Sequence, residues 1–222
     1  MAISSIAAGS RSASAAAWSM RARMSARRRE AVSISDMGHA IGGGMQPRQP
    51  ELPSLWMMTD ERQGEALWAA LRRLPPGSGI VFRHKSLLDR ERRRLFERVR
   101  RITRRRGLIL LLAGDEAEAR RWGADGAHHR RPGPPRAGTA PAHNLREIRA
   151  AERSGAAALL LSPLHPTRSH PGAPTLGRMR FAAMARATRL PVIALGGIDR
   201  RRGRAAMAVG AHGWAAIDAW TQ

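Results

Sequence analysis

The sequence predicts an α/β fold in which about eight parallel strands, each followed by a helix, close into a compact (β/α)8 barrel. One observation is a series of short apolar runs of strand length: LWMM (55–58), GIVF (79–82), GLILLL (107–112), ALLLS (158–162) and PVIAL (191–195). The other is that segments of helical period lie between these runs. A doubly wound open sheet has the same alternation, so periodicity leaves both architectures open.

The remaining elements follow in a regular order from residue 52 onward. Leu67, Leu71 and Leu74 recur at helical spacing after the first apolar run and predict the first helix. Asn144 and Asp199 are residue types that cap helices, and each stands before a predicted helix. Three weaker strand candidates complete the set of eight: ADGAH (124–128), GTAPA (138–142) and WAAI (214–217).

The most basic segment is DRERRRLFERVRRITRRR (89–106), which is expected to be a helix. Its residues Leu95, Val99 and Ile102 would form one buried stripe, and its arginines a solvated face. The formal net charge of +22 is spread over the whole chain, without zinc-finger spacing or an RNA-stacking aromatic motif. Nucleic acid is therefore not an expected partner.

The composition changes near residue 50. Residues 1–50 are rich in Ala, Ser, Gly and Arg, and their only acids are Glu30 and Asp36. Such a segment cannot bury enough apolar surface to fold, so it is expected to be a disordered tail in front of a barrel domain over 51–222. A transit peptide, or translation that begins at a later methionine, would explain the tail equally well.

The chain contains no cysteine and no apolar run of about 18 residues, the length that a membrane span requires. A disulfide framework and a thiolate metal site are therefore excluded. No membrane association is expected, and a cytoplasmic location is the interpretation that we adopt. The sequence leaves the oligomeric state open, including a homo-oligomer.

Four stretches resemble one known family in the right order: WGADGAHH (122–129), AHNLREIRAAERSGAAALLLSPLHPTRSHPGAPTLG (142–177), LPVIALGGI (190–198) and VGAHGWAAIDA (209–219). The family is the thiamine-phosphate synthase/TenI family, and the resemblance runs from about residue 52 to the end. Its most specific part is the SP-x-x-PT-x-S element followed by ALGGI. It implies a TIM barrel, a role in thiamine biosynthesis, and a phosphorylated thiazole or thiamine-like molecule as the ligand.

The resemblance also implies two phosphate-binding elements. Arg83 and Lys85, the only lysine of the chain, match a basic pair at the end of the second strand that helps to hold a pyrophosphate. On a strand, side chains two positions apart point to the same side. Gly196 and Gly197 follow the seventh predicted strand, where backbone N–H groups can approach a phosphate closely. A plain tight turn before the next helix is the alternative for this pair.

One departure in the phosphate region concerns the last strand. Asp218 stands where the family usually has a small hydroxyl residue. A carboxylate repels a phosphate dianion unless it points away or is neutralised.

Larger departures concern the magnesium that synthases of this family hold with acidic residues. Ala113 and Gly114 occupy the first acidic position, and His129, Arg130 and Arg131 replace the second. Arginine offers no oxygen to magnesium, which prefers oxygen ligands. No metal site and no cofactor are therefore expected, and magnesium would be needed only if the protein is a synthase. Asp115, one residue out of register, is the alternative ligand that could partly compensate. Arg130 and Arg131 are expected to neutralise phosphate instead.

His143 after the fifth strand matches the histidine with which TenI-type tautomerases shuttle a proton, although it could equally just position the turn before Asn144. Polar residues expected to bind substrate follow the sixth strand: Ser162, Thr167, Ser169 and His170. Three functions follow. The first is a metal-independent thiazole tautomerase-like enzyme. The second is a thiamine-phosphate synthase that joins aminopyrimidine pyrophosphate to thiazole phosphate. The third is a non-catalytic phosphate-ligand-binding or regulatory protein.

Overall fold

A computed structural model describes residues 52–129, 138–169 and 171–220 of the chain. Eight parallel strands form one sheet in the order β4-β3-β2-β1-β8-β7-β6-β5. They are β1 (Leu55–Met58), β2 (Gly79–Phe82), β3 (Ile109–Leu112), β4 (Gly126–Ala127), β5 (Thr139–Ala142), β6 (Ala158–Leu161), β7 (Val192–Ala194) and β8 (Gly213–Ala216). The fold is therefore the predicted TIM barrel, and the pairing of β1 with β8 rules out the doubly wound alternative.

The two outermost strands of this order, β4 and β5, nearly close the barrel. An isolated parallel bridge joins His128 and Thr139, and the amide of His129 donates to the carbonyl of Thr139 at 3.2 Å. The ring nitrogen Nδ1 of His128 also lies 2.8 Å from the hydroxyl of Thr139. In the described residues these few contacts replace a regular ladder between the two strands, because β4 is just two residues long.

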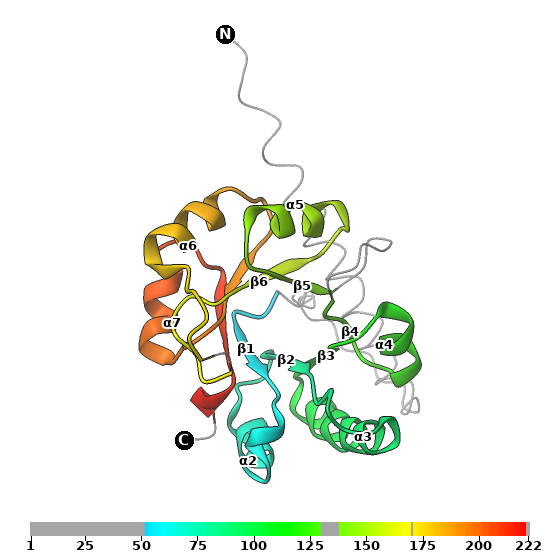
Figure 1. The fold of residues 1–222 in the computed structure, drawn as a ribbon. Coiled ribbons are helices and arrows are strands. Elements are labelled where there is room, and N and C mark those ends of the chain that lie inside the picture. The colour runs from blue at the N-terminus through cyan, green and yellow to red at the C-terminus, as the bar shows by residue number, and fades with distance from the viewer. Residues whose placement is uncertain (1–51, 130–137, 170, 221–222) are drawn as a thin grey trace, which may run out of the picture.

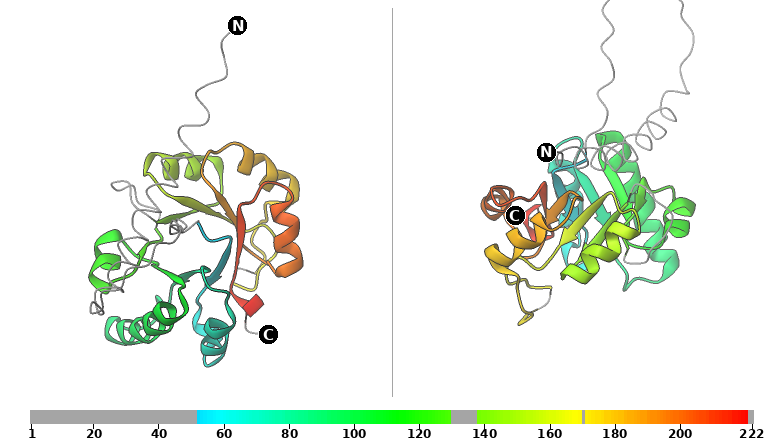
Figure 2. Two further views of the ribbon diagram at one scale, coloured as in Figure 1. Left: turned by 180° about the vertical axis from the view of Figure 1, so that it is seen from behind. Right: turned by 90° about the horizontal axis from the view of Figure 1, so that it is seen from above.

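Helices surround the strands on the outside of the barrel, as Figures 1 and 2 show from several sides. They are α2 (Ala66–Arg73), α3 (Asp89–Arg106), α4 (Glu116–Trp122), α5 (Leu145–Arg153), α6 (Gly177–Arg186) and α7 (Arg200–Met207). Two short 3-10 helices, η1 (Glu61–Gln63) and η2 (Asp218–Trp220), follow β1 and β8. The tail predicted over residues 1–50 lies outside the described residues.

The apolar core has an inner and an outer layer, because neighbouring side chains on a strand point to opposite faces. Trp56, Val81 and Ile193 belong to the cluster inside the barrel. Met57 and Leu161 point outward into the clusters between the sheet and the helices. Strands that are buried on both faces appear in the sequence as continuous apolar runs, which is why these runs predicted them.

Helix α3 has the predicted bounds, but its buried stripe is wider than the sequence suggested. Val99 is fully buried, and Leu95 and Ile102 are partly buried, as predicted. Phe96 is also fully buried, and Arg92 is only 6% exposed. The prediction that all arginines of this helix lie on a solvated face is therefore wrong for Arg92.

The carboxyl ends of the strands meet at one rim of the barrel, and the loops after them carry the polar side chains described below. In the described residues, no helix combines the length and the apolar composition that a membrane span needs.

Candidate functional site

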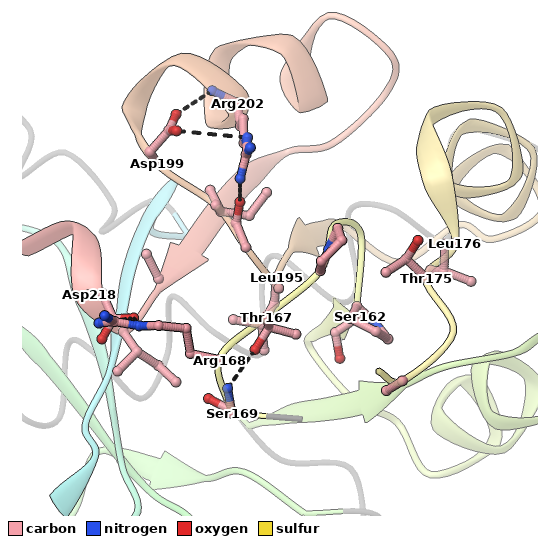
Figure 3. A pocket seen from close by; sticks show the side chains of 18 of the residues that line it. Ser162, Thr167, Arg168, Ser169, Thr175, Leu176, Leu195, Asp199, Arg202 and Asp218 are labelled. Carbon is pink, nitrogen blue, oxygen red and sulfur yellow. Dashed lines mark hydrogen bonds and ion pairs between the residues drawn. The ribbon is translucent and has the colours of Figure 1, made fainter. Parts of the chain in front are cut away.

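A cavity of about 630 Å³ opens at the rim formed by the carboxyl ends of the strands. Figure 3 shows part of its lining, which comes from several loops. Arg83 follows β2, His143 follows β5, and further residues belong to the loops after β6, β7 and β8. The site therefore lies where TIM barrels usually carry their chemistry.

The lining of this cavity carries more positive than negative charge. It contains two acidic side chains, Asp199 and Asp218, and four arginines: Arg83, Arg168, Arg180 and Arg202. A cleft lined by one sign of charge concentrates ligands of the other sign. An anion is therefore the ligand class that the described lining favours.

Gly196 and Gly197 line the cavity directly after β7. Both have positive φ angles, 99° and 60°, which side chains other than glycine rarely adopt. A Cβ on Gly196 would lie 2.7 Å from the Cα of Pro163, and one on Gly197 would meet the carbonyl oxygen of Pro166. The loop after β6 thus packs directly on the glycine pair, and no larger residue fits at either position.

Helix α7 begins just beyond these glycines. As predicted, Asp199 caps it, with its carboxylate accepting the amide of Arg202 at 2.7 Å. This backbone hydrogen bond, with the positive charges of Arg202 and Arg201, lowers the pKa of Asp199 below its usual value. The guanidinium of Arg202 reaches back and donates to the carbonyl of Gly197 at 2.8 Å. A fixed positive group therefore stands beside the glycine turn.

The loop after β6 supplies the predicted hydroxyl residues Ser162, Thr167 and Ser169, which all line the cavity. The hydroxyl of Thr167 accepts the amide of Ser169 at 3.0 Å. The guanidinium of Arg62, after β1, donates to the hydroxyl of Ser169 at 3.0 Å. His170, the fourth predicted residue of this loop, lies outside the described residues.

Asp218 faces the same cavity from the end of β8, and the loop after β6 neutralises it. Its carboxylate lies 3.0 Å from Nη2 and 3.3 Å from Nε of Arg168, as drawn in Figure 3. The carboxylate of Asp218, whose negative charge would repel a phosphate, is therefore paired with a guanidinium. The ion pair also ties the loop after β6 to the loop after β8.

His143 lies between β5 and α5 and lines the cavity. Its Nδ1 atom is 2.8 Å from Oε2 of Glu147, and the same oxygen accepts its backbone amide at 2.7 Å. Asn144 caps α5 as predicted, because its side chain accepts the amide of Glu147 at 2.9 Å. The imidazole thus stands at a tightly hydrogen-bonded helix start, with 37% of its side chain exposed.

The structure separates Arg83 from Lys85. Strand β2 ends at Phe82, and His84 between the two basic residues has a positive φ of 41°. The expectation that both side chains point the same way along a strand is therefore wrong. Arg83 lines the cavity and lies 3.7 Å from a carboxylate oxygen of Asp60, whereas Lys85 is exposed and not among the described lining residues.

His84 is buried in the turn that separates these two residues. Its ring stacks on Phe82 with a centroid distance of 4.9 Å, and its Nδ1 lies 3.0 Å from the hydroxyl of Thr59. Burial lowers the pKa of His84 below the ordinary value of an imidazole. The same hydroxyl accepts the amide of Arg83 at 2.9 Å, which holds the turn against β1.

The positions after β3, where the resemblance implies magnesium ligands, do not fit a metal ion. Ala113 and Gly114 have no side-chain oxygen, and the carboxylate of Asp115 caps α4 by accepting the amide of Glu118 at 2.7 Å. The guanidinium of Arg92 donates to the carbonyl of Ala113 at 2.9 Å, so a cation already stands there.

The second implied metal position is only partly described. His129 is half-buried beside β5, and Arg130 and Arg131 lie outside the described residues. In the described ranges, no group of three or more His, Asp or Glu side chains has a geometry that could hold a metal ion.

Sequence reasoning missed several residues of the site. Arg168, Arg180 and Arg202 line the cavity but were indistinguishable from the many other arginines. For Arg168 a signal existed, because it lies inside the SP-x-x-PT-x-S element that carries the resemblance. Glu147 also had one: it stands four residues after His143, one helical turn away.

Comparisons with known proteins agree on one family. The model of the family described as "Thiamine monophosphate synthase" matches residues 137–220. A protein of Aquifex aeolicus (strain VF5) named "Putative thiamine-phosphate synthase 2" is 33% identical over 180 residues, which are 75% of this chain and 97% of that protein.

Solved structures show the same fold. A thiamine phosphate pyrophosphorylase from Pyrococcus furiosus superposes with a TM-score of 0.64 at 24% identity, covering 75% of this chain and 86% of the other. One from Bacteroides thetaiotaomicron gives a TM-score of 0.52 at 16% identity, covering 75% and 83%.

Proposed function

The chain belongs to the thiamine-phosphate synthase/TenI family, and from this premise we propose that it binds a phosphorylated thiazole and isomerises it without a metal, with His143 as acid and base. Two observations support the proposal: the imidazole of His143 lines the cavity, and the first implied metal position, after β3, offers no suitable ligand in the described residues. Isomerisation needs only a proton that leaves one atom and returns to another.

The proposed phosphate contact lies at the turn after β7. The backbone of Gly196 and Gly197 can approach a phosphate closely because neither residue has a side chain. Arg202 stands beside this turn, and Ser162 and Thr167 add hydroxyl donors from the facing loop. Arg83 would contribute from the loop after β2, and Arg130, Arg131 and His170 stay predictions for the same ligand.

The proposed chemical step is a proton shuttle within one site. The Nε2 atom of His143 removes a proton from the bound thiazole, and the imidazolium returns it at the position that completes the isomer. The ring of the substrate loses and regains one proton, so the imidazole ends the cycle neutral. No oxidant, metal or co-substrate takes part.

A synthase is the second candidate, and the name of the Aquifex aeolicus relative favours it. In that reaction pyrophosphate leaves the aminopyrimidine, and the thiazole nitrogen attacks the resulting cation. The departing pyrophosphate accumulates negative charge, which Arg83, Arg168 and Arg180 in the described lining could offset. Without an acidic metal site, this cluster would have to replace magnesium.

One assay separates the two candidates. Purified protein is incubated with thiazole carboxylate phosphate, and separately with aminopyrimidine pyrophosphate plus thiazole phosphate, each with magnesium or with a chelator. We expect isomerisation that the chelator leaves unchanged, and coupling that is undetectable or very slow in both conditions. Magnesium-dependent coupling at an ordinary enzymatic rate would make the protein a synthase, and no product from either set would favour a binding or regulatory protein.

The basic residues after β2 give a test of ligand binding. We expect Arg83→Ala to weaken the binding of thiazole phosphate by about 1.5–3 kcal/mol, the range for a hydrogen bond to a charged group. Isothermal titration calorimetry measures this loss. Lys85→Ala is the comparison, because Lys85 is exposed two residues further on. A similar loss in both variants supports the predicted basic pair, whereas an unchanged affinity in Arg83→Ala contradicts the role of Arg83.

A further inference from the structure

We propose that Glu147 is a positioning residue that fixes the tautomer of His143 and thereby directs Nε2 of the imidazole to the substrate. The inference rests on the proposed function, because His143 is the acid and base of that reaction. It adds a residue that neither the sequence motifs nor the comparisons single out. Glu147 does not touch the substrate in this proposal and acts only through the imidazole.

The tautomer follows from the chemistry of the pair. A carboxylate only accepts hydrogen bonds, so at 2.8 Å the Nδ1 atom of His143 must carry the shared proton. In the neutral ring, Nε2 then carries the lone pair and is the nitrogen that can act as a base. The other neutral tautomer would place a lone pair on Nδ1 against the oxygen of Glu147, and this contact is repulsive.

The orientation of Glu147 is itself determined by the start of α5. Its amide donates to the side chain of Asn144 at 2.9 Å, and its Oε2 atom accepts both the ring and the backbone amide of His143. Two hydrogen bonds to one oxygen restrict both the position and the rotation of the imidazole. The residue order His-Asn-x-x-Glu brings these groups together because residues four apart lie on one helix face.

The carboxylate has a second effect during the reaction. When Nε2 takes up a proton, the ring becomes positive while Oε2 of Glu147 stays 2.8 Å away. The two groups then form an ion pair across the hydrogen bond that already joins them. Glu147 is only 29% exposed, which weakens the screening of this interaction by solvent.

The alternative is that Glu147 only caps the helix. Three variants separate the two roles. Glu147→Gln keeps the size of the side chain but allows its amide to donate to Nδ1. Glu147→Asp keeps the negative charge at the helix start but shortens the side chain by one methylene. Glu152→Gln is the control on the same helix, because Glu152 bonds to Arg149 and Thr188 and is not among the described cavity residues.

The primary measurement is the tautomer of His143, read at neutral pH by ¹⁵N–¹H correlation NMR of the full-length protein. The signals of His143 are assigned as those that disappear in His143→Ala. We expect the Nδ1–H form in the wild type and in Glu152→Gln, and a substantial fraction of the Nε2–H form in Glu147→Gln and Glu147→Asp. Retention of the Nδ1–H form in both Glu147 variants would overturn the proposal, and this readout is independent of any enzymatic activity.

The second measurement is steady-state isomerisation by the same proteins. We expect kcat to fall about 10-fold or more in Glu147→Gln, the scale for losing a group that orients a functional histidine, with KM within about 2-fold of the wild type. Circular dichroism confirms that each variant is folded. A changed tautomer with unchanged kcat would show that the tautomer set by Glu147 does not matter for isomerisation, and this would overturn its role in directing Nε2 to the substrate. A wild type that is itself inactive would disprove the proposed function and leave the NMR result to decide whether Glu147 fixes the tautomer.

Discussion

A His143→Ala variant isomerises thiazole carboxylate phosphate about 100-fold more slowly than the wild type, or worse, while it binds thiazole phosphate with nearly the same affinity. This is our expectation because a positioned acid and base contributes roughly 10²–10⁴-fold to a proton transfer. The phosphate contacts proposed for Gly196 and Gly197 are untouched by the change. Steady-state kinetics in the presence of a chelator gives the rate, and calorimetry gives the affinity.

His212→Ala is the matched control for this experiment. His212 directly precedes β8, at the rim opposite to the cavity, and its ring lies 3.0 Å from the carbonyl of Leu52. We expect the control to retain the wild-type rate. Isomerisation at the wild-type rate in His143→Ala would remove the proposed acid and base, and a large loss of affinity would instead assign His143 to binding.

Removal of the buried guanidinium of Arg92 has the largest expected effect on stability. In Arg92→Met we expect the free energy of unfolding to fall by about 3–5 kcal/mol, the range for deleting one partner of a buried ion pair. The guanidinium contacts Glu118 at 2.8 Å, Ala113 O at 2.9 Å and Arg83 O at 3.0 Å. Methionine fills a similar volume but leaves these acceptors without their donor.

Urea denaturation measures this loss, and Arg93→Met on the same helix is the control. Arg93 pairs with Glu97 at the surface, with 37% of its side chain exposed, so its removal should cost less than about 1 kcal/mol. If both variants lose the same small amount, water or local relaxation has replaced the contacts of Arg92. The contribution of Arg92 to the free energy of unfolding would then be no larger than that of an exposed arginine, despite its burial.

The strands were predictable because burial on both faces makes them apolar throughout. β1 and β2 coincide with the runs LWMM and GIVF, whereas β4 contains only Gly126 and Ala127 of the weaker candidate ADGAH. A strand of two small residues has almost no pattern of its own. Its pattern supported only a weak strand candidate, and the resemblance, which extends across that segment, agrees with its place.

The errors arose where distant residues decide the local environment. Arg92 looked like any other charge of a basic helix, because its acceptors at Arg83, Ala113 and Glu118 belong to other loops. Lys85 was expected beside Arg83 on a strand, but the strand ends two residues after Ile80 and the backbone then turns at His84. Side chains alternate between the two faces of a strand only as far as the strand keeps its hydrogen bonds to its neighbours.

Much of the candidate site was predictable because family motifs indicate which loops matter. His143, the hydroxyl residues after β6 and the glycine pair after β7 all line the same cavity. The arginines of that cavity were not predictable, because composition offers too many of them. Which arginines line the cavity depends on which loops and helix starts face the rim of the barrel. Only the three-dimensional structure shows this.

For the phosphorylated ligand that we propose, the ion pair between Arg168 and Asp218 predicts binding by exchange. At 3.0 Å the guanidinium is already engaged, so a phosphate that recruits it must displace the carboxylate. The attraction between Arg168 and the phosphate is partly offset by the loss of the contact between Arg168 and Asp218. This lowers the affinity for the phosphate and helps Arg168 to return to Asp218. In the proposed reaction this exchange would favour release of the phosphorylated product, because the carboxylate of Asp218 is held nearby to replace it.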